Sequence, residues 1–185
     1  RLWTSPITFV ASANCARYCG AEVDFVDIEP TTGLMSVAAL AAKLEQAERD
    51  GTLPKVVVPV HLCGTSCAMQ PIAVLANRYG FAVLEDASHA IGGRYQAEPV
   101  GNCCYSAISV FSFHPVKIIT TGEGGLATTN DPYLAQRMAD LRSHGITKEA
   151  QRFERQAPGP WSYEQQDLGF NYRITDLQAA LGLSQ

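Results

Sequence analysis

Short runs of apolar and β-branched residues alternate with segments of helical periodicity in the first half of the chain. The expected strands occupy residues 23–27, 55–60 and 81–85, and the expected helices occupy residues 36–50 and 71–79. The runs 56–58 and 81–84 are almost entirely apolar, which is typical of strands covered on both faces. The alternation predicts an α/β fold with a mostly parallel sheet flanked by helices, and places these two runs at its centre.

Capping residues mark several helix ends. In the helix over 36–50, one face collects the apolar residues Val37, Leu40, Ala41, Leu44 and Ala47. Gly51 is placed to end this helix, and Pro71 suits the first turn of the next one. Thr175 and Gln178 form a capping box that predicts the start of a final helix.

The second half of the chain carries weaker patterns. Strands are expected over 106–113 and 125–129, and the Asp-Pro pair at 131–132 predicts a helix that ends near Gly145. Residues 148–163 are polar, contain proline and lack a period, which indicates a loop. Because no repeat or long linker divides the sequence, we treat it as one unit.

The composition is that of an ordinary globular domain and argues against several classes of protein. The 185 residues are 46% apolar and 17% charged, which is enough to bury a core. A net charge of -4 argues against a general nucleic-acid surface. No apolar run approaches the roughly 20 residues that cross a bilayer, and the first residues lack a signal-peptide pattern. We therefore expect a cytoplasmic protein with neither nucleic acid nor membrane as a partner.

Six cysteines occur in three close pairs, at 15 and 19, 63 and 67, and 103 and 104. In a chain long enough to hold its own core, we expect free, partly buried thiols rather than a disulfide framework. The alternative is a metal site made of His61, Cys63 and Cys67. A structural zinc site needs four ligands, commonly from two closely spaced pairs, and the second pair is missing. We therefore expect no metal.

Two of the expected strands lead into reactive residues. The strand over 81–85 is followed by Asp86 and His89, and the strand over 106–113 is followed by Lys117. In open α/β sheets, ligands bind beyond the carboxyl ends of the strands, so these side chains are candidates for a ligand site. Each also has a structural explanation, since such an acid can cap a helix and a lysine can be a solvated tip.

Lys117 differs from the other three lysines in its surroundings. Lys43 lies on the polar side of a helix, Lys55 leads into a strand and Lys148 lies in the polar loop. Lys117 is flanked by Pro-Val and Ile-Ile, an apolar setting in which a charged ammonium is costly. A neutral amine is the nucleophile of Schiff-base chemistry, whereas the alternative is a lysine whose head group reaches solvent. These residues alone leave both interpretations open.

Five motifs occur in an order that resembles one enzyme family. They are Glu85-Asp86-Ala87-Ser88-His89-Ala90, Phe111-Ser112-Phe113-His114-Pro115-Val116-Lys117, Gly122-Glu123-Gly124-Gly125, Arg142-Ser143-His144-Gly145 and Gly169-Phe170-Asn171-Tyr172-Arg173. Together they resemble the nucleotide-sugar aminotransferases of the DegT/DnrJ/EryC/StrS type, and the resemblance runs from Trp3 to Gln185. These are pyridoxal-phosphate (PLP) enzymes of the aspartate-aminotransferase fold, fold type I.

The resemblance implies that residues 1–185 are part of a PLP-binding large domain. The family's small-residue phosphate-binding turn would precede Arg1, and its small C-terminal domain would follow Gln185. We therefore expect a fragment of a longer protein. An apolar segment that begins directly at residues 3–10 and a final helix without a terminating signal agree with this expectation.

The resemblance also implies roles for six side chains. Lys117 would bind pyridoxal 5'-phosphate through a Schiff base and then move protons, while Asp86 would pair with the pyridine nitrogen. The other cofactor contacts would be Ser112 with the phosphate, Phe9 with one face of the ring, His89 with the other face or the ring oxygen, and Asn171 with the phosphate in the neighbouring subunit. Such shared sites imply a homodimer.

The residues at 111–121 and at 159–161 resemble those of the branch of the family that serves pseudaminic acid biosynthesis. It implies amino transfer from glutamate to C4 of a UDP-linked 4-keto-6-deoxy-N-acetylhexosamine. The alternatives are another nucleotide-sugar aminotransferase or a catalytically silent binding or regulatory member of the fold. Relatives that remove a sugar hydroxyl carry histidine in place of Lys117, which argues against that reaction. The resemblance leaves open the roles of Glu123, His144, Tyr172 and Arg173.

Overall fold

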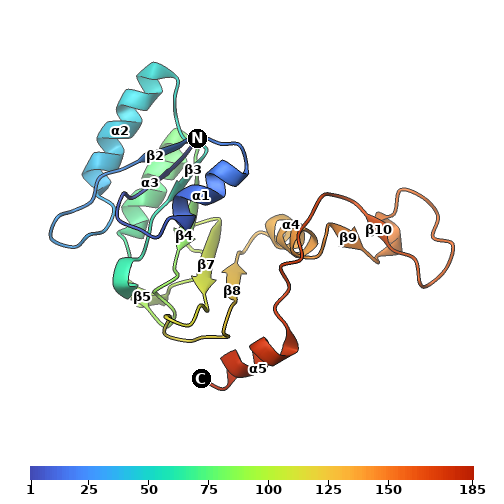
Figure 1. Cartoon of the computed structure of the whole chain (residues 1–185). Helices are drawn as coiled ribbons and strands as arrows, with labels where there is room; N and C mark the ends of the chain where they lie inside the picture. The colour runs from blue at the N-terminus through green and yellow to red at the C-terminus, as the bar shows by residue number, and fades with distance from the viewer.

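A six-stranded sheet forms the centre of the computed structural model, which describes residues 1–185 (Figure 1). The strands are β1 (Leu2–Thr4), β2 (Val23–Phe25), β3 (Val56–Val58), β4 (Ala82–Asp86), β7 (Ile108–Ser112) and β8 (Gly125–Thr128). They lie in the order β2-β1-β3-β4-β7-β8, and every neighbouring pair is parallel except β7 and β8. The prediction of a mostly parallel sheet with 56–58 and 81–84 at its centre is confirmed.

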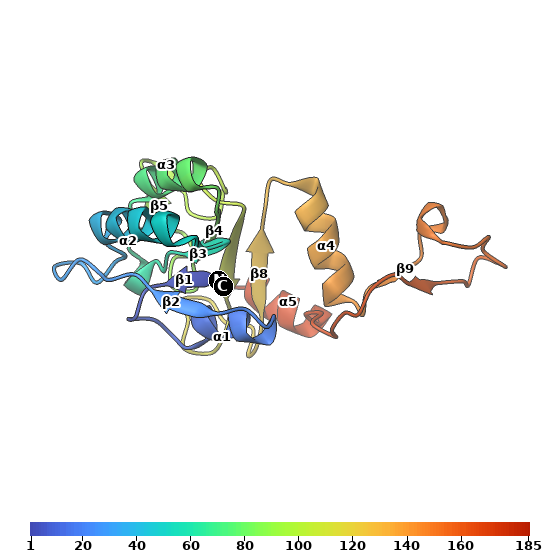
Figure 2. The ribbon, with the colours of Figure 1, turned by 90° about the horizontal axis from the view of Figure 1, so that it is seen from above.

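Helices cover both faces of this sheet (Figure 2). The helices are α1 (Ala11–Tyr18), α2 (Val37–Asp50), α3 (Met69–Tyr79), α4 (Pro132–Arg142) and α5 (Asp176–Leu183). Helices α2 and α3 lie on one face and α1 lies on the other. This layering explains why the central strands are apolar on both sides. No helix is long and apolar enough to cross a membrane.

The predicted end of α2 at Gly51 and the predicted capping box of α5 are present. The Ser36 side chain accepts a hydrogen bond from the backbone of α2, and Gly51 ends that helix with a left-handed φ of 65°. Gly80 ends α3 in the same way, with a φ of 73°. Thr175 and Gln178 form the expected capping box at the start of α5.

The main core lies between the sheet and helices α2 and α3. It contains 15 buried residues. Four of them, Trp3, Leu40, Leu44 and Ile72, are each at most 2% exposed. On the opposite face, Ala16 of α1 packs with two buried strand residues, Leu2 and Val58. Successive residues of β1 therefore serve the two faces in turn, as the pleat of a strand requires.

Some elements differ from the sequence expectation. Helix α1 was not predicted, and it begins after Val10 without a side-chain cap. Strand β8 runs antiparallel to β7 because the twelve residues from Phe113 to Gly124 that connect them contain no crossover helix. Two small antiparallel pairs were also missed: β5 (Arg94–Tyr95) with β6 (Glu98–Pro99), and β9 (Ile146–Thr147) with β10 (Glu164–Gln165).

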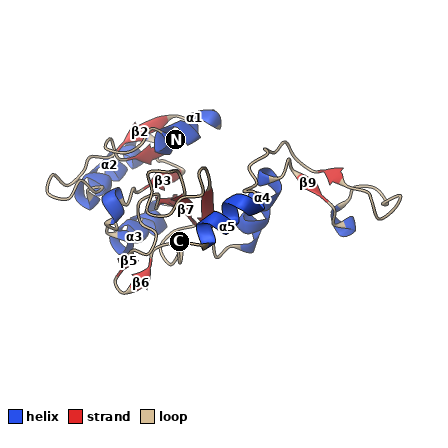
Figure 3. Cartoon of the chain, turned by 60° about the horizontal axis from the view of Figure 1, so that its bottom comes forward, coloured by secondary structure: helices blue, strands red, loops and turns tan.

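Residues 129–185, here called the C-terminal arm, extend away from the sheet and return (Figure 3). The chain passes through α4 and out to β9 and β10, and then comes back to α5 near the sheet. The predicted loop 148–163 lies at the outer end and contains only a short 3-10 turn, Ala150–Arg152. No buried hydrophobic residue of the molecule comes from the arm.

Candidate active site

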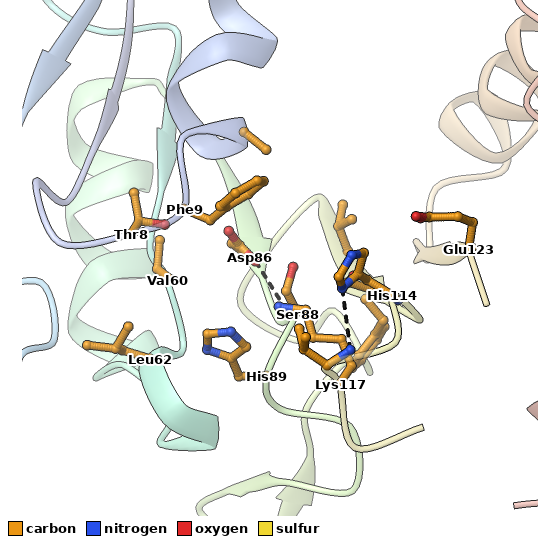
Figure 4. Close-up of a pocket in the computed structure, with 16 residues that line it drawn as sticks. Thr8, Phe9, Val60, Leu62, Asp86, Ser88, His89, His114, Lys117 and Glu123 are labelled. Atoms are coloured by element: carbon orange, nitrogen blue, oxygen red, sulfur yellow. Dashed lines mark hydrogen bonds between the residues drawn. The ribbon is translucent and has the colours of Figure 1, made fainter. Parts of the chain in front are cut away.

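A cavity of about 440 Å³ opens at the edge of the sheet where the parallel strands end (Figure 4). Its walls come from the segments that follow β1 and β3, from the last residue of β4, and from β7 with the turn that follows it. This edge is where open α/β sheets bind ligands, because the loops diverge there while the strands hold them. The volume lies in the range of small-molecule sites, about 300 to 1,000 Å³.

Two neighbouring acids at the end of β4 have different surroundings. Glu85 is on the same side of the strand as the buried Val83, is 5% exposed, and pairs with the Nε2 atom of His61 at 2.8 Å. Asp86, the next residue, points to the opposite face and lines the cavity. The alternation of the strand thus places Asp86, and not Glu85, in the candidate site.

The Asp86 carboxylate is oriented through both oxygens. The Ser12 hydroxyl, on α1, donates to Oδ2 at 2.6 Å, and the Ser88 backbone N–H donates to Oδ1 at 3.1 Å. The Thr8 hydroxyl lies 3.0 Å from the Ser12 hydroxyl. A carboxylate held at two points keeps a fixed direction, which a group that must meet one ligand atom requires.

Lys117 lies in the turn after β7 and lines the same cavity. Its backbone N–H donates to the carbonyl oxygen of His114 at 2.9 Å, whereas its side-chain amine has neither a hydrogen-bond nor an ion-pair partner. The flanking residues Val116 and Ile118 do not enclose this amine, because they are themselves 78% and 69% exposed. Val116 lines the cavity together with Lys117, so the cavity forms the surroundings of the amine.

Five of the six predicted site residues meet in this cavity. Phe9, His89 and Ser112 line it together with Asp86 and Lys117, and Figure 4 shows four of them around one space. The Phe9 ring is 74% exposed, so one face is open to a ligand. The geometry therefore brings together an aromatic ring, a carboxylate, an imidazole, a hydroxyl and an amine. The role of each side chain stays a prediction.

Asn171 does not line the cavity. It lies in the C-terminal arm, where it forms an isolated β-bridge with Ser143, and its side-chain amide has no partner within the chain. Of the residues whose roles the sequence left open, Glu123 lines the cavity and His144, Tyr172 and Arg173 do not. The expected role of Asn171 in a neighbouring subunit stays a prediction.

Sequence reasoning missed several contributors to the site. His114 stood in a quoted motif without a role, and it lines the cavity beside Lys117. Thr8 and Ser12 were not singled out, the latter because α1 was not predicted. Only Ser12 and Ala16 of that helix are buried, too few to give a helical pattern.

The metal site considered for His61, Cys63 and Cys67 does not form. Both nitrogens of His61 have partners, since Nε2 pairs with Glu85 and Nδ1 accepts from the Cys67 backbone N–H at 3.2 Å. Burial raises the pKa of the Cys67 thiol to about 12, and its Sγ atom donates to the carbonyl oxygen of Val60 at 3.1 Å. No group of three potential metal ligands is found in the chain. All six cysteines are free thiols, which confirms that prediction.

Residues 2–185 match the model of the DegT/DnrJ/EryC1/StrS aminotransferase family. The chain belongs to this family. A relative from Campylobacter jejuni, named UDP-4-amino-4,6-dideoxy-N-acetyl-beta-L-altrosamine transaminase, is 37% identical over 182 residues, which cover 98% of the chain and 44% of the relative. The chain therefore spans less than half the length of this aminotransferase.

Solved structures of the family share the fold. Helicobacter pylori PseC, described as an aminotransferase involved in the biosynthesis of pseudoaminic acid, superposes with a TM-score of 0.84 at 34% identity, over 100% of this chain and 45% of its own. The sugar aminotransferase Spr1654 of Streptococcus pneumoniae, described as putative and solved in its PMP form, gives a TM-score of 0.79 at 26% identity, over 99% and 49%. It has also been solved in a PLP form. The fold type I aminotransferase fold implied by the sequence motifs is thereby confirmed.

Proposed function

We propose that the protein containing this chain is a PLP-dependent nucleotide-sugar aminotransferase. The observation that carries the proposal is that Lys117 and Asp86, which come from different strand ends, line one cavity in a chain of this family. Had these two side chains faced separate spaces, no single cofactor could have met both.

The residues around the cavity fit pyridoxal phosphate. They offer an amine without a competing partner, an oriented carboxylate and an open aromatic ring, the features that this cofactor needs for attachment, pairing of its ring nitrogen and stacking. When bound, pyridoxal phosphate supplies an electron-withdrawing ring that stabilises negative charge at the substrate carbon. Lys117 would hold the cofactor, with Ser112 at its phosphate and with Phe9 and His89 at its ring.

Lys117 and Asp86 would perform the chemistry of this chain. The Lys117 Nζ atom would move a proton between the substrate carbon and the cofactor carbon, acting first as a general base and then as a general acid. Asp86 would keep the proton on the pyridine nitrogen. At an effective dielectric constant near 20, such an ion pair at about 4 Å is worth about 4 kcal/mol before desolvation is subtracted.

For the substrates we propose glutamate as the amino donor and a UDP-linked 4-keto-6-deoxy-N-acetylhexosamine as the acceptor at C4. The name of the Campylobacter relative and the residues at 111–121 and 159–161 support these substrates. They would place the protein in the biosynthesis of pseudaminic acid or related surface sugars. Another nucleotide-sugar aminotransferase is the alternative. The proposed setting is the cytoplasm, where nucleotide sugars are made.

We further propose that the chain is part of a large PLP-binding domain and acts as a homodimer with shared sites. Asn171 would reach the cofactor phosphate of the neighbouring subunit. Its exposed position in the C-terminal arm, outside the cavity of its own chain, supports this assignment.

The first test asks whether the full-length protein binds the cofactor through Lys117. Adding pyridoxal phosphate should give a visible absorbance band, and borohydride should fix the cofactor to the peptide that contains Lys117. The Lys148→Arg protein, altered in the exposed arm, should behave like the parent, while Lys117→Arg should give no fixed adduct. A protein that binds no cofactor would instead support a silent member of the fold.

The second test concerns the substrates. The cofactor-loaded protein should convert glutamate to 2-oxoglutarate in the presence of a UDP-4-keto-6-deoxy-N-acetylhexosamine, and the product should carry an amine at C4. Turnover only with a GDP- or TDP-linked keto sugar would assign the protein to another branch and leave the aminotransferase proposal intact.

The third test separates a shared site from a site within one chain. Mixed dimers of Lys117→Ala and Asn171→Ala subunits contain one intact site if Asn171 acts across the dimer. If Asn171 acts in its own chain, every site of the mixed dimer lacks one of the two residues. Recovery of activity after mixing two inactive variants therefore supports the shared site, and no recovery contradicts it.

A further inference from the structure

A chain of hydrogen bonds connects the acid of the candidate site to the segment that carries Phe9. From this geometry we infer that Ser12 is a positioning residue, which orients Asp86 and fixes it relative to the aromatic ring. The inference rests on the proposed function, because it concerns how the site would receive the pyridine ring of the cofactor.

Ser12 contacts both parts of the site. Its hydroxyl donates to Asp86 Oδ2 at 2.6 Å, and its backbone N–H donates to the carbonyl oxygen of Phe9 at 3.2 Å. The serine is 6% exposed and lies at the second position of α1. A hydroxyl so deeply buried needs a partner, and here the partner is the acid rather than the end of its own helix.

The direction of the hydrogen bonds is determined. A serine hydroxyl has one hydrogen, and Ser12 uses it for Asp86, so its oxygen accepts from the Thr8 hydroxyl at 3.0 Å. Thr8 itself lines the cavity next to Phe9. The order Thr8 to Ser12 to Asp86 therefore runs from the cavity wall to the carboxylate, and hydrogen bonds in such a series strengthen one another.

The two partners of the Asp86 carboxylate have different consequences. The Ser88 backbone N–H is two residues away on the same segment and moves with the acid. Ser12 belongs to another element, 74 residues distant in the sequence. Only the Ser12 bond fixes the acid relative to the Phe9 segment, so the ring face and the ring nitrogen of a bound cofactor would meet one rigid unit.

Ser36 provides a matched control. It is also 6% exposed, it also stands at the start of a helix, and its hydroxyl also donates to a carboxylate, that of Glu29. Its partner Glu29 does not line the cavity, whereas Thr8 and Asp86, the partners of Ser12, do. Replacing either serine by alanine should therefore lower the stability of the fold, but only Ser12→Ala should change the bound cofactor.

The experiment compares Ser12→Ala and Ser36→Ala in the full-length protein with added pyridoxal phosphate. We expect Ser12→Ala to weaken cofactor binding about tenfold, as for the loss of one hydrogen bond to a charged group. We also expect a shift in the pH at which the absorbance of the bound cofactor changes. Ser36→Ala should match the parent in both measurements, and Ser12→Thr should restore much of the affinity.

Several results would overturn the inference. It fails if Ser12→Ala and Ser36→Ala lose equal affinity, or if the pH titration of the bound cofactor stays that of the parent. Should Ser12→Ala not fold, Ser12→Cys keeps the volume and replaces the hydroxyl with a weak donor, and the same comparison decides. A parent protein that binds no pyridoxal phosphate would instead refute the proposed function, and this inference with it.

Discussion

The sheet with its helices, residues 2–128, and the C-terminal arm, residues 129–185, are stabilised in different ways. Every buried hydrophobic residue lies between Leu2 and Phe111, so the sheet region contains the entire apolar core. In the arm, the side chains Leu177 and Leu183 are 86% and 89% exposed, and Trp161 is 74% exposed. The sheet region therefore has its own apolar core, and the arm has none.

Polar contacts hold the arm instead. Asp140 is 5% exposed and accepts hydrogen bonds from Arg152 at 3.1 Å and from Gln136 at 2.9 Å. Arg137 pairs with Asp167 and connects α4 to the returning chain. Partly exposed ion pairs contribute little to stability, about 0 to 1 kcal/mol each. The arm also leaves large apolar side chains exposed, among them Trp161, Leu177 and Leu183.

The two proposed functions, cofactor binding and contact with a neighbouring subunit, lie in different regions. The cavity with Lys117 and Asp86 is built on strand ends within the sheet region, where a packed core holds the side chains in place. Asn171, proposed to act in the neighbouring subunit, lies on the C-terminal arm. Five predictions test this division, beginning with the largest expected effect.

The same substitution in the two regions should have opposite consequences for activity. Lys117→Arg removes the amine that would attach the cofactor and move the proton, and we expect aminotransferase activity to fall by about 10³-fold or more. Lys148→Arg, in the exposed arm, should retain parental activity. Initial rates of 2-oxoglutarate formation measure both. Full activity of Lys117→Arg would show that the reaction does not need the Lys117 amine.

Leucine truncation on two helices compares the stability of the regions. Leu44→Ala on α2 leaves a cavity in the main core, and we expect the free energy of unfolding to fall by about 2 to 5 kcal/mol. Leu177→Ala on α5 should cost less than about 0.5 kcal/mol, because the side chain is mostly exposed. Urea denaturation measures both. A large loss for Leu177→Ala that depends on protein concentration would show that a second chain covers the arm.

Removing Arg152 tests the polar contacts of the arm. Arg152→Gln leaves the buried Asp140 carboxylate without its cation, and we expect faster cleavage of residues 146–166 by chymotrypsin. Arg155→Gln, an exposed arginine without an ion pair, is the control. The sheet region should resist cleavage equally in both proteins. Equal cleavage of the arm in both variants would show that this ion pair does not hold it.

The same contact gives a pH dependence. The hydrogen bonds from Arg152 hold the pKa of Asp140 below its usual range. A carboxyl group with a lowered folded-state pKa contributes its full stability above its unfolded value, about pH 4, and loses it as the pH falls through the folded value. The arm should therefore become more sensitive to pepsin below about pH 4 in the parent than in Arg152→Gln, relative to each protein at pH 5.

The smallest expected effect is a gain in stability at one turn of the sheet region. Gln96 and Ala97 join β5 to β6 with φ values of 48° and 67°, a conformation that suits glycine better than alanine. Ala97→Gly should raise the free energy of unfolding by about 0.5 to 1 kcal/mol. The matched change Ala42→Gly, exposed within α2, should lower it by about 1 kcal/mol. A loss at both positions would show that the turn is not strained.

The success of sequence reasoning also divides between these regions. The core helix α2 and the strands β3 and β4 were predicted because burial imposes a period on their residues. Helix α1 was not predicted because only two of its residues are buried. The pair of β9 and β10 was not predicted because each strand has two residues and no apolar pattern. A pattern arises only where a core selects residue types.

For the site, motifs singled out Lys117, Asp86, His89 and Ser112, whereas the chain neighbours of Lys117 left open whether its amine is buried. Neighbours in the sequence report what precedes and follows a residue, not which way its side chain points. Val116 and Ile118 illustrate this, since both are exposed and only Val116 lines the cavity with the lysine.

The sequence by itself determined the core helix α2, the strands β3 and β4, and the family motifs, because these depend on residue type and on spacing along one segment. Only the tertiary structure decided which of the two adjacent acids faces the cavity, and that a serine from α1 orients it. Ser12 and Asp86 are 74 residues apart, and their contact is created by the packing of a helix on a sheet. No period or spacing within one segment records such a contact.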